Sequence, residues 1–193
     1  MFNKQIKLFF FVLILLQCAF PLKGLAESHK KDSWYIGFGL GGGVDARYTL
    51  DGKDITFDDW INGVEEKSPK IAINFKVGGM LSPKTLIGFD VTAVGQTGKL
   101  GGEDVQIQIN NYFLMFTHFP LEEGFFIRGG GGFSNIMNKT PISTEVVSGY
   151  GILGGLGYAF WLGKHFNLTL NLDHSRQYYS AGAQKPDKSQ FTI

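Results

Sequence analysis

Two stretches of this sequence have residue types and spacings that could support chemistry. In WYIGFGLGGG, residues 34–43, three glycines follow the G-x-G-x-x-G spacing of a dinucleotide-binding turn. The same spacing recurs in GYGILG at residues 149–154, which a single cofactor site would not require. A dinucleotide turn must also open a helix, whereas the loop-like VDARYTLDGK follows Gly43. We therefore expect no cofactor, and we interpret these glycines as small residues of a β-strand.

The second stretch is acidic and could bind a metal ion. Residues 45–67 hold seven Asp and Glu against three Lys and Arg, but they lack the D-x-[DN]-x-[DN]-G order of an EF-hand. We expect a solvated, exposed loop and no metal site. Divalent cations that bridge this loop to lipopolysaccharide phosphates stay open as an alternative.

The elements that position these residues follow from the period of the apolar side chains, which is two. In FNLTLNLDHS, residues 166–175, and KIAINFKVGG, residues 70–79, apolar and polar residues alternate. VQIQI at 105–109 alternates likewise, and we assign its Val and Ile residues to the lipid side and its Gln residues to the lumen. No segment carries the stripe of an amphipathic helix, so the sequence predicts strands with two unlike faces throughout.

The links between the strands carry a second regularity. The predicted strands cover residues 34–44, 68–81, 86–97, 105–118, 125–134, 149–162 and 166–177. Between them, tight turns such as SPKT at 82–85 alternate with longer loops such as 45–67, 98–104 and 135–148. This alternation, with strands long enough to cross a bilayer, is typical of an up-and-down outer-membrane barrel.

The N-terminus has the features of a secretory signal peptide. A basic start, an apolar stretch and the small-x-small sequence GLA ending at Ala26 predict that residues 1–26 are removed, leaving one barrel domain at 27–193. The alternative, a lipoprotein signal at Cys18, fits less well because a glutamine precedes that cysteine. Cleavage would remove the only cysteine and lower Lys plus Arg from 18 to 15, against 17 Asp plus Glu. Such a chain has no disulfide and lacks the basic face that nucleic acid requires.

With its signal, alternating strands and unequal links, the chain resembles the small eight-stranded outer-membrane barrels of Gram-negative bacteria, the OmpA/OmpX-like class. YFLMFTHFPLEEGFFIRGGGGFSN is one stretch that carries the resemblance. It implies an all-β, up-and-down antiparallel transmembrane barrel in the cell outer membrane. A monomer is implied, placed there by the barrel-insertion machinery and surrounded by lipid and lipopolysaccharide. Such barrels usually end in a complete strand with a terminal aromatic residue, whereas SQFTI at 189–193 is half a strand ending in Ile. We expect seven full strands and a short eighth, and we favour a truncated C-terminus.

This register sends a set of polar and charged side chains into a narrow lumen, which side chains must fill. Buried charges require partners, so we expect an ion-pair and hydrogen-bond network. Its predicted members are Asn74, Lys76, Asp90, Thr92, Arg128, Asn171 and Asp173. Aromatic residues gather near the short turns, where amphipathic rings would lie at the membrane interface. The predicted members of this girdle are Trp34, Tyr35, Phe119, Phe125, Phe160, Trp161 and Phe166.

The functional prediction is a structural or surface-interaction role, with a surface ligand at loops 45–67 and 135–148. One alternative is a lipid A-modifying enzyme, because outer-membrane lipid A deacylases carry a His-x-Ser-Asn pattern with both catalytic side chains on one strand face. Here His174 and Ser175 are adjacent and should point to opposite faces, so we predict no catalytic site. A small pore for ions or apolar solutes is a second alternative. A soluble periplasmic barrel is a third, and it would be extracted without detergent.

Overall fold

All regular elements of the chain are β-strands in the part that the structure describes. The computed structural model describes residues 34–43, 45–50, 53–56, 66–122, 124–161, 167–179 and 188–192. The strands are β1 (Trp34–Gly42), β2 (Asp45–Leu50), β3 (Lys53–Thr56), β4 (Glu66–Lys67), β5 (Ile71–Ser82), β6 (Thr85–Leu100), β7 (Glu103–His118), β8 (Phe125–Lys139), β9 (Thr144–Trp161), β10 (Asn167–Tyr179) and β11 (Lys188–Thr192). No helix long and apolar enough to cross a membrane occurs among these residues. The predicted signal peptide, residues 1–26, lies outside them.

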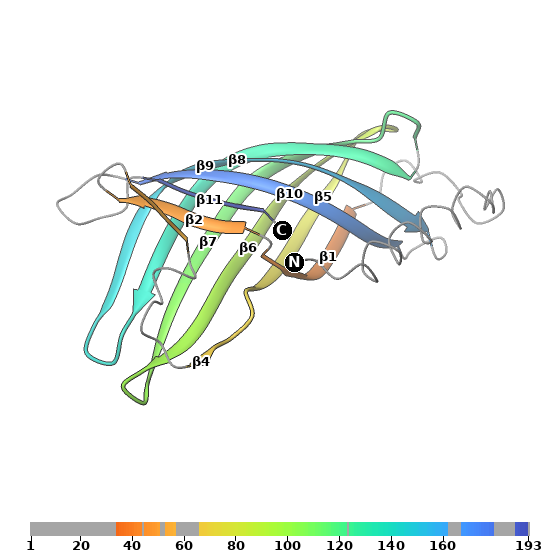
Figure 1. Cartoon of the computed structure of the whole chain (residues 1–193). Helices are drawn as coiled ribbons and strands as arrows, with labels where there is room; N and C mark the ends of the chain where they lie inside the picture. Colours follow the sequence, from red (N-terminus) through yellow and green to blue (C-terminus); the bar gives the residue numbers. More distant parts are fainter. Residues whose placement is uncertain are drawn as a thin grey trace.

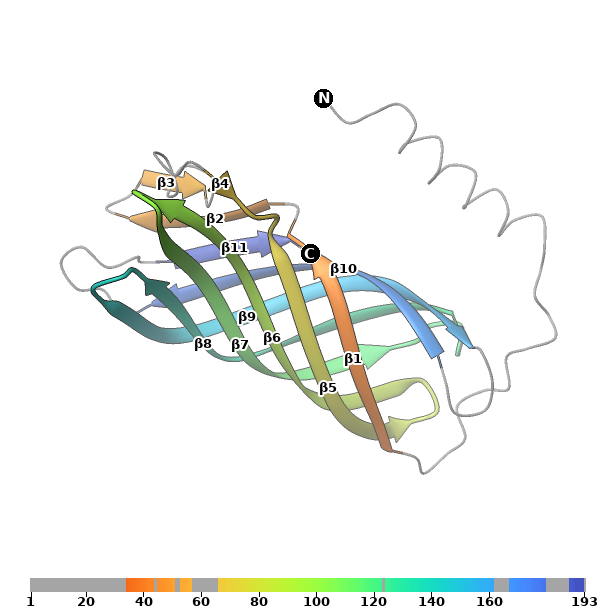
Figure 2. The ribbon, with the colours of Figure 1, turned by 90° about the horizontal axis from the view of Figure 1, so that it is seen from below.

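The strands form one antiparallel sheet with an up-and-down order. Neighbours follow β1-β5-β6-β7-β8-β9-β10-β11-β2-β3, and β4 pairs with β6. From β5 to β10 each strand pairs with the next one along the chain. Figures 1 and 2 show the sheet curling into an open half-barrel, with β1 at one edge and β2 and β3 at the other. The all-β, up-and-down antiparallel barrel fold predicted from the alternation is confirmed.

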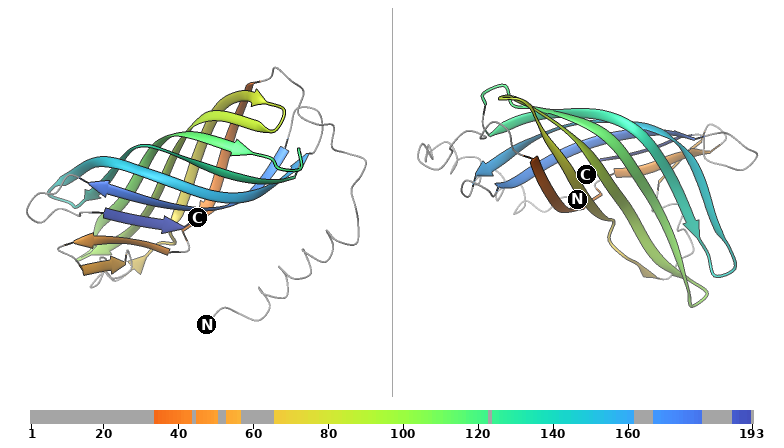
Figure 3. Two further views of the ribbon diagram at one scale, coloured as in Figure 1. Left: turned by 90° about the horizontal axis from the view of Figure 1, so that it is seen from above. Right: turned by 180° about the vertical axis from the view of Figure 1, so that it is seen from behind.

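The two ends of the sheet carry different connections, and we call them the near end and the far end. At the near end lie the β5–β6 turn and the β7–β8 connection, and at the far end lie the β6–β7 and β8–β9 hairpins (Figure 3). The far-end links are shorter than predicted. Gly101 and Gly102, with φ of 62° and 83°, are the turn between β6 and β7, since tight hairpin turns require positive φ. Residues 140–143 link β8 to β9, so most of the predicted loops 98–104 and 135–148 is strand.

The predicted loop 45–67 is also partly strand, and β2 lies within it. β2 begins at Asp45, shortly after β1 ends at Gly42, yet the two strands pair at opposite edges of the sheet. β1 pairs with β5, whereas β2 pairs with β3 and β11. This strand was not predicted because its sequence is mostly polar. A strand outside the lipid-facing part of the wall needs no row of apolar side chains.

The short strand β11, predicted as half a strand at 189–193, joins β10 to the β2–β3 hairpin at the far end. It pairs with His174–Tyr178 of β10 on one side and with β2 on the other. Residues 167–173 of β10 therefore have β9 as their only partner among the described strands, and β1 has only β5. Among the described strands no pairing joins β1 to β2 or β3, so the half-barrel stays open along that side.

The convex outer face of the sheet is apolar through its middle. Along β1 the outward side chains alternate with inward glycines, and Leu40 and Phe38 expose 86% and 82% of their surface. Other large apolar side chains of this face, each at least half exposed, are Trp34, Ile36, Ile71, Ile73, Leu114, Phe133, Tyr150, Ile152, Leu168, Leu170 and Leu172. Contiguous exposed apolar area on this scale is unusual for a protein in water, and it matches the lipid-facing band of a transmembrane barrel.

The structure contradicts the predicted orientation of residues 105–109 in β7. The Val and Ile residues of this segment face inward and expose at most 5% of their surface, while its two Gln residues face outward. The pairing of β7 with β6 is unbroken from Glu103 to His118, so the outward parity of Leu114 extends to Gln108. Alternation shows that the two faces differ, but it does not show which one is inside. Toward the far end the interior is apolar and the outer face is polar.

Inward-facing glycines make room for large side chains on neighbouring strands. Tyr35 lies so close to Gly88 that a Cβ there would overlap its hydroxyl oxygen, and a Cβ on Gly155 would overlap a carboxylate oxygen of Asp173. Gly39, in the stretch that resembles a dinucleotide turn, is less crowded, because its Cβ would lie at an ordinary 3.5 Å from the nearest side chain. The glycines therefore shape the interior, and the tightest positions are outside the stretch 34–43.

Candidate functional site

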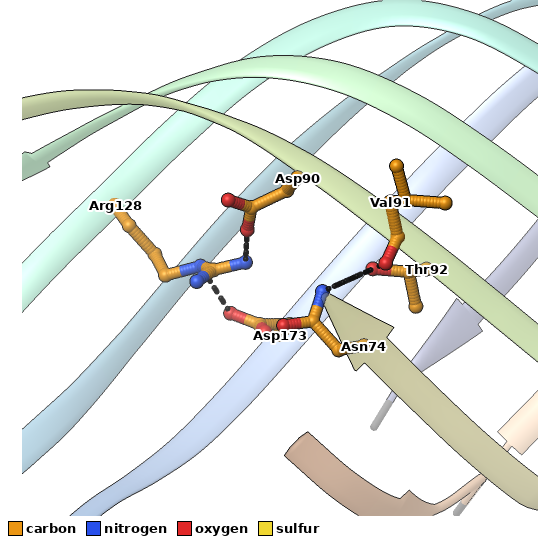
Figure 4. Close-up of polar contacts among 6 residues, drawn as sticks. All are labelled: Asn74, Asp90, Val91, Thr92, Arg128 and Asp173. Carbon is orange, nitrogen blue, oxygen red and sulfur yellow. Dashed lines mark hydrogen bonds and ion pairs between the residues drawn. The ribbon is translucent and has the colours of Figure 1, made fainter. Parts of the chain in front are cut away.

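Three charged residues from three strands meet inside the half-barrel. Figure 4 shows the guanidinium of Arg128, on β8, between the carboxylates of Asp90 on β6 and Asp173 on β10. Its Nη2 donates to Oδ2 of Asp90 at 2.7 Å. Its Nε lies 3.1 Å from Oδ1 of Asp173, an ion pair whose angle does not suit a hydrogen bond. Gly155 of β9 is the cross-strand partner of both Arg128 and Asp173. Because it has no side chain, the Arg128 and Asp173 side chains can meet across β9.

Three further predicted members of the network lie on β5 and β6 beside this charge cluster. Lys76 is the cross-strand partner of Asp90, so two cations and two anions balance in this part of the interior. Nδ2 of Asn74 donates to Oγ1 of Thr92 at 2.7 Å and to the carbonyl oxygen of Val91 at 3.3 Å (Figure 4). These contacts tie β5 to β6 at the level of the charges.

Asn171, the remaining predicted member, has the inward parity of Asp173 on β10. Its Oδ1 is buried, but no hydrogen bond joins it to the charge cluster among the described residues. The structure thus places all seven predicted residues inside and connects Asp90, Arg128 and Asp173 directly.

A second polar layer, absent from the sequence prediction, lies farther toward the far end. Oδ1 of Asn111 on β7 accepts from Oγ of Ser134 on β8 at 2.8 Å and from Nε2 of Gln177 on β10 at 3.2 Å. Gln177 also donates to Oγ of Ser175 at 2.8 Å, and none of the four side chains exposes more than 2% of its surface. The inward parity of Asp173 would have pointed to both β10 residues, because they follow it by two and four positions.

Apolar side chains lie between the charge cluster and the second polar layer on β7 and β9. Phe113, Met115 and Leu153 form a buried cluster. Along β9, Leu153 stands between Gly155, which is opposite Asp173, and a glycine opposite the second polar layer. Packed hydrocarbon therefore covers the charge cluster on these two strands, whereas on β6 Thr92 is the cross-strand partner of Asn111 and joins the two polar layers.

Another apolar layer closes the interior at the near end. Phe119, Phe126 and Ala159 are exposed by 3% or less, and the two phenylalanine rings lie 5.3 Å apart. Beyond the second polar layer, toward the far end, the buried apolar side chains are Val94, Val105, Ile107, Ile109 and Ile136. Polar and apolar layers thus alternate along the barrel interior.

Two predicted girdle residues belong to this interior, and their assignment to the membrane interface is wrong. Phe119 is buried because the connection after β7 folds inward, where its backbone N–H donates to the carbonyl oxygen of Lys84 at 2.8 Å. Tyr35 follows Trp34 in β1, so its side chain takes the opposite face and lies across inward glycines. Trp34 itself points outward and is 73% exposed.

Phe125 and Phe160, two other predicted girdle residues, lie near the same end of the sheet. Phe125 is outward and 39% exposed, and Phe160 packs against Tyr158 with ring centroids 4.8 Å apart. The side chain of Trp161 and all of Phe166 lie outside the part of the chain that the structure describes.

The chemistry that this interior offers is mutual neutralisation and packing. His174 is outward and Ser175 is inward, so the two cannot form a hydrogen-bonded pair. Within the described residues no group of three or more His, Cys, Asp or Glu could hold a metal ion, and the side chains of loop 45–67 lie mostly outside that set. The arrangement can hold strands together across the lumen and obstruct passage through it.

The strand order, the apolar convex face and the filled polar interior decide the architecture. The fold is that of a small transmembrane β-barrel. No protein-family model matches the chain, and no curated protein matches it. Among solved structures, the chain is similar to the outer membrane protein OprG from Pseudomonas aeruginosa at 14% identity and a TM-score of 0.45, over 86% of this chain and 90% of that one. The assignment of the fold rests on the strands and their faces, independently of that similarity.

Proposed function

We propose that the protein is a non-conducting, non-enzymatic barrel of the cell outer membrane that presents its far end for surface interaction. In this orientation the near-end turns face the periplasm, and residues 1–26 direct export and are then removed. The observation that carries the proposal is the layered interior. The charges of Arg128, Asp90 and Asp173 compensate one another between two packed apolar layers.

The filled interior supports a barrel that does not conduct, rather than a pore. A conducting lumen needs a wide polar path, and here Phe113 lies beside the charge cluster and Phe126 at the near end, each exposing no more than 2% of its surface. A barrel of this strand number has an interior just wide enough to be filled by side chains. Passage would require rearranging both apolar layers.

The geometry also supports a role without catalysis. A serine nucleophile needs a base within hydrogen-bond reach. Ser175 instead accepts a hydrogen bond from the side-chain amide of Gln177 inside the barrel. The long far-end hairpins extend past the apolar belt and provide surface for contacts with other molecules.

Conductance across planar phospholipid bilayers tests this function. The purified protein should require detergent for extraction, migrate as a heat-modifiable band, and give no steady current after insertion. Protein-free bilayers treated with the same detergent give the background. Persistent, uniform current steps that scale with the amount of inserted protein would contradict the proposal and favour a pore.

A further inference from the structure

Four side-chain amides form a hydrogen-bonded ladder on the outer face of β7 and β8 near the far end. Nε2 of Gln106 donates to Oε1 of Gln108 at 3.0 Å, and Nε2 of Gln108 donates to Oδ1 of Asn110 at 2.5 Å. Nδ2 of Asn110 then donates to Oδ1 of Asn135 across the strand boundary at 2.8 Å. Each amide N–H donates to the oxygen of the next amide, from Gln106 to Asn135. These hydrogen bonds restrict the rotamers of the four side chains.

The ladder belongs to the same outer face as the apolar belt. Unbroken pairing of β7 gives Gln108 and Asn110 the parity of Leu114 and Phe116, which expose 50% and 44% of their surface. The amides are partly buried against one another, while the residues between them in sequence are fully inside. On the outer face of β7 the lipid-facing apolar side chains are followed directly by amides. We therefore infer that the strand leaves the hydrocarbon core of the bilayer at this level.

Aromatic side chains lie between the belt and the ladder. Tyr112 and Phe133 are cross-strand partners, and the partner of Phe133 on β9 is Tyr150. Their exposed fractions are 40%, 73% and 63%, so their rings are available on the outer face. Tyr150 is also stacked on Tyr178 of β10, with ring centroids 5.4 Å apart.

A cation lies beside the last amide of the ladder toward the far end. Lys139 is the cross-strand partner of Gln106, is exposed, and has the same outward parity. Toward the far end, this part of the wall therefore carries apolar side chains, then aromatic rings and then amides, with a cation beside the last amide. A ligand that matches all four must have hydrocarbon, a ring with hydroxyl groups, and an anion in the same order.

We propose that this wall, residues 106–116 of β7 with 133–139 of β8, binds the headgroup of a phosphorylated glycolipid. The acyl chains lie along Leu114 and Phe116, a sugar ring stacks on Phe133, the amides exchange hydrogen bonds with its hydroxyl groups, and Lys139 contacts a phosphate. Each amide carries two N–H donors and an oxygen with two lone pairs, so capacity remains after the ladder bonds are made. The inference rests on the proposed membrane location and adds to it a specific lipid partner.

A glycolipid explains the ladder better than an ordinary phospholipid does. An anionic phospholipid supplies acyl chains and a phosphate, which account for the apolar belt and Lys139, but its headgroup offers the amides few hydroxyl groups and no ring to stack on Phe133. Preorganised amides beside an exposed aromatic face suit a ligand with many hydroxyl groups, since holding the side chains in advance lowers the cost of ordering them on binding.

Native mass spectrometry of the folded full chain in detergent can measure this binding. The probes are a bis-phosphorylated diglucosamine lipid, the same lipid without phosphates, and phosphatidylglycerol. The test variants are Asn110→Leu and Lys139→Gln. Their matched controls at the near end are Asn167→Leu and Lys84→Gln, which remove an exposed amide and an exposed lysine. Heat-modifiable migration establishes that each variant is folded, and Gln108→Leu replaces Asn110→Leu if that variant does not fold.

The expected order of affinity is bis-phosphorylated glycolipid, then dephosphorylated glycolipid, then phosphatidylglycerol. Asn110→Leu should weaken binding of both glycolipids at least fivefold, the equivalent of about one neutral hydrogen bond, while Asn167→Leu stays within twofold of the wild type. Lys139→Gln should weaken only the phosphorylated probe, and Lys84→Gln should change neither.

Equal affinity for phosphatidylglycerol and the phosphorylated glycolipid would overturn the inference, as would an Asn110→Leu variant that binds like the wild type. A dimer of the wild type that Asn110→Leu dissociates would assign the ladder to self-association instead. Each of these results is compatible with a non-conducting barrel, whereas steady conductance refutes the proposed function and does not affect the lipid measurement.

Discussion

Removal of Arg128 should destabilise the barrel more than any loss of an exposed charge. The side chain is 4% exposed and reaches Asp90 at 2.7 Å and Asp173 at 3.1 Å. At an effective dielectric constant of about 20, a pair of unit charges about 3 Å apart attracts by roughly 5–6 kcal/mol before desolvation is subtracted. Arg128→Met leaves two buried carboxylates with Lys76 as the remaining cation of this cluster.

The net effect is smaller than the bare attraction, because desolvation offsets much of it. Breaking a buried pair by removing one partner costs about 3–5 kcal/mol, and we expect Arg128→Met to lower the free energy of unfolding by that amount. Asp90→Asn should cost less, about 1.5–3 kcal/mol, since Arg128 keeps its contact with Asp173. Replacing these three residues together with Lys76, the cross-strand partner of Asp90, by Leu or Met should recover most of the loss, because packed apolar residues often substitute for buried ion pairs.

Urea titration of the protein in phospholipid vesicles measures these differences, with the folded fraction read from heat-modifiable migration and tryptophan fluorescence. The control is Lys84→Met, which removes the Lys84–Glu122 pair, 3.4 Å long with side chains 45% and 54% exposed. An exposed pair contributes about 0–1 kcal/mol, so this variant should stay close to the wild type. The reasoning is refuted if Arg128→Met is as stable as Lys84→Met.

Two further predictions compare positions on the same strand. Gly155→Ala should reduce stability by about 1–3 kcal/mol in the same titration because its Cβ overlaps the Asp173 carboxylate, whereas Gly154→Ala, which has nothing within 4 Å, should be neutral. Equal effects of the two would show that the inward and outward faces of β9 are assigned wrongly. Leu114→Arg should lower the free energy of unfolding in vesicles by about 2–4 kcal/mol, and Gln106→Arg by about 0–1 kcal/mol, because the cost of a charge on the lipid face falls toward the interface. Similar costs at both positions would contradict the boundary between lipid and water along β7.

The strands and the charge cluster could be predicted because their signals are local. A period of two over ten or more residues identifies a strand without knowledge of its partners. A charge such as Asp90 in an otherwise apolar strand must then face inward, away from lipid. Arg128 and Asp173 follow from the same argument, and the narrow interior brings them together with Asp90.

The orientation of the far-end segments could not be predicted, because it depends on where each strand leaves the membrane. Within hydrocarbon the apolar face is outside, but above it the interior is filled like the core of a soluble protein. Residues 105–109 lie in that upper part, so their Val and Ile residues turn inward although the alternation is unchanged. Tyr35 shows a related limit, since an aromatic residue near a strand end fits both an interface and a space left by inward glycines.

The pairing of β2 with β11 also could not be predicted from the sequence. Both strands are short and polar, and a pattern of side chains does not show which strands will pair. The long acidic stretch 45–67 therefore gave the signals of a loop while part of it served as an edge strand.

The most direct test of the account is a quenching scan along β7 in phospholipid vesicles, with single labelled cysteines placed in a background that lacks Cys18. Labels at Leu114 and Phe116 should be quenched by a lipid-soluble quencher, and labels at Gln106 and Gln108 by a water-soluble one. A label at Ile107 should be shielded from both, because this side chain has 0% exposure. Equal quenching by the water-soluble reagent at positions 114 and 106 would contradict a membrane-spanning wall with a polar far end.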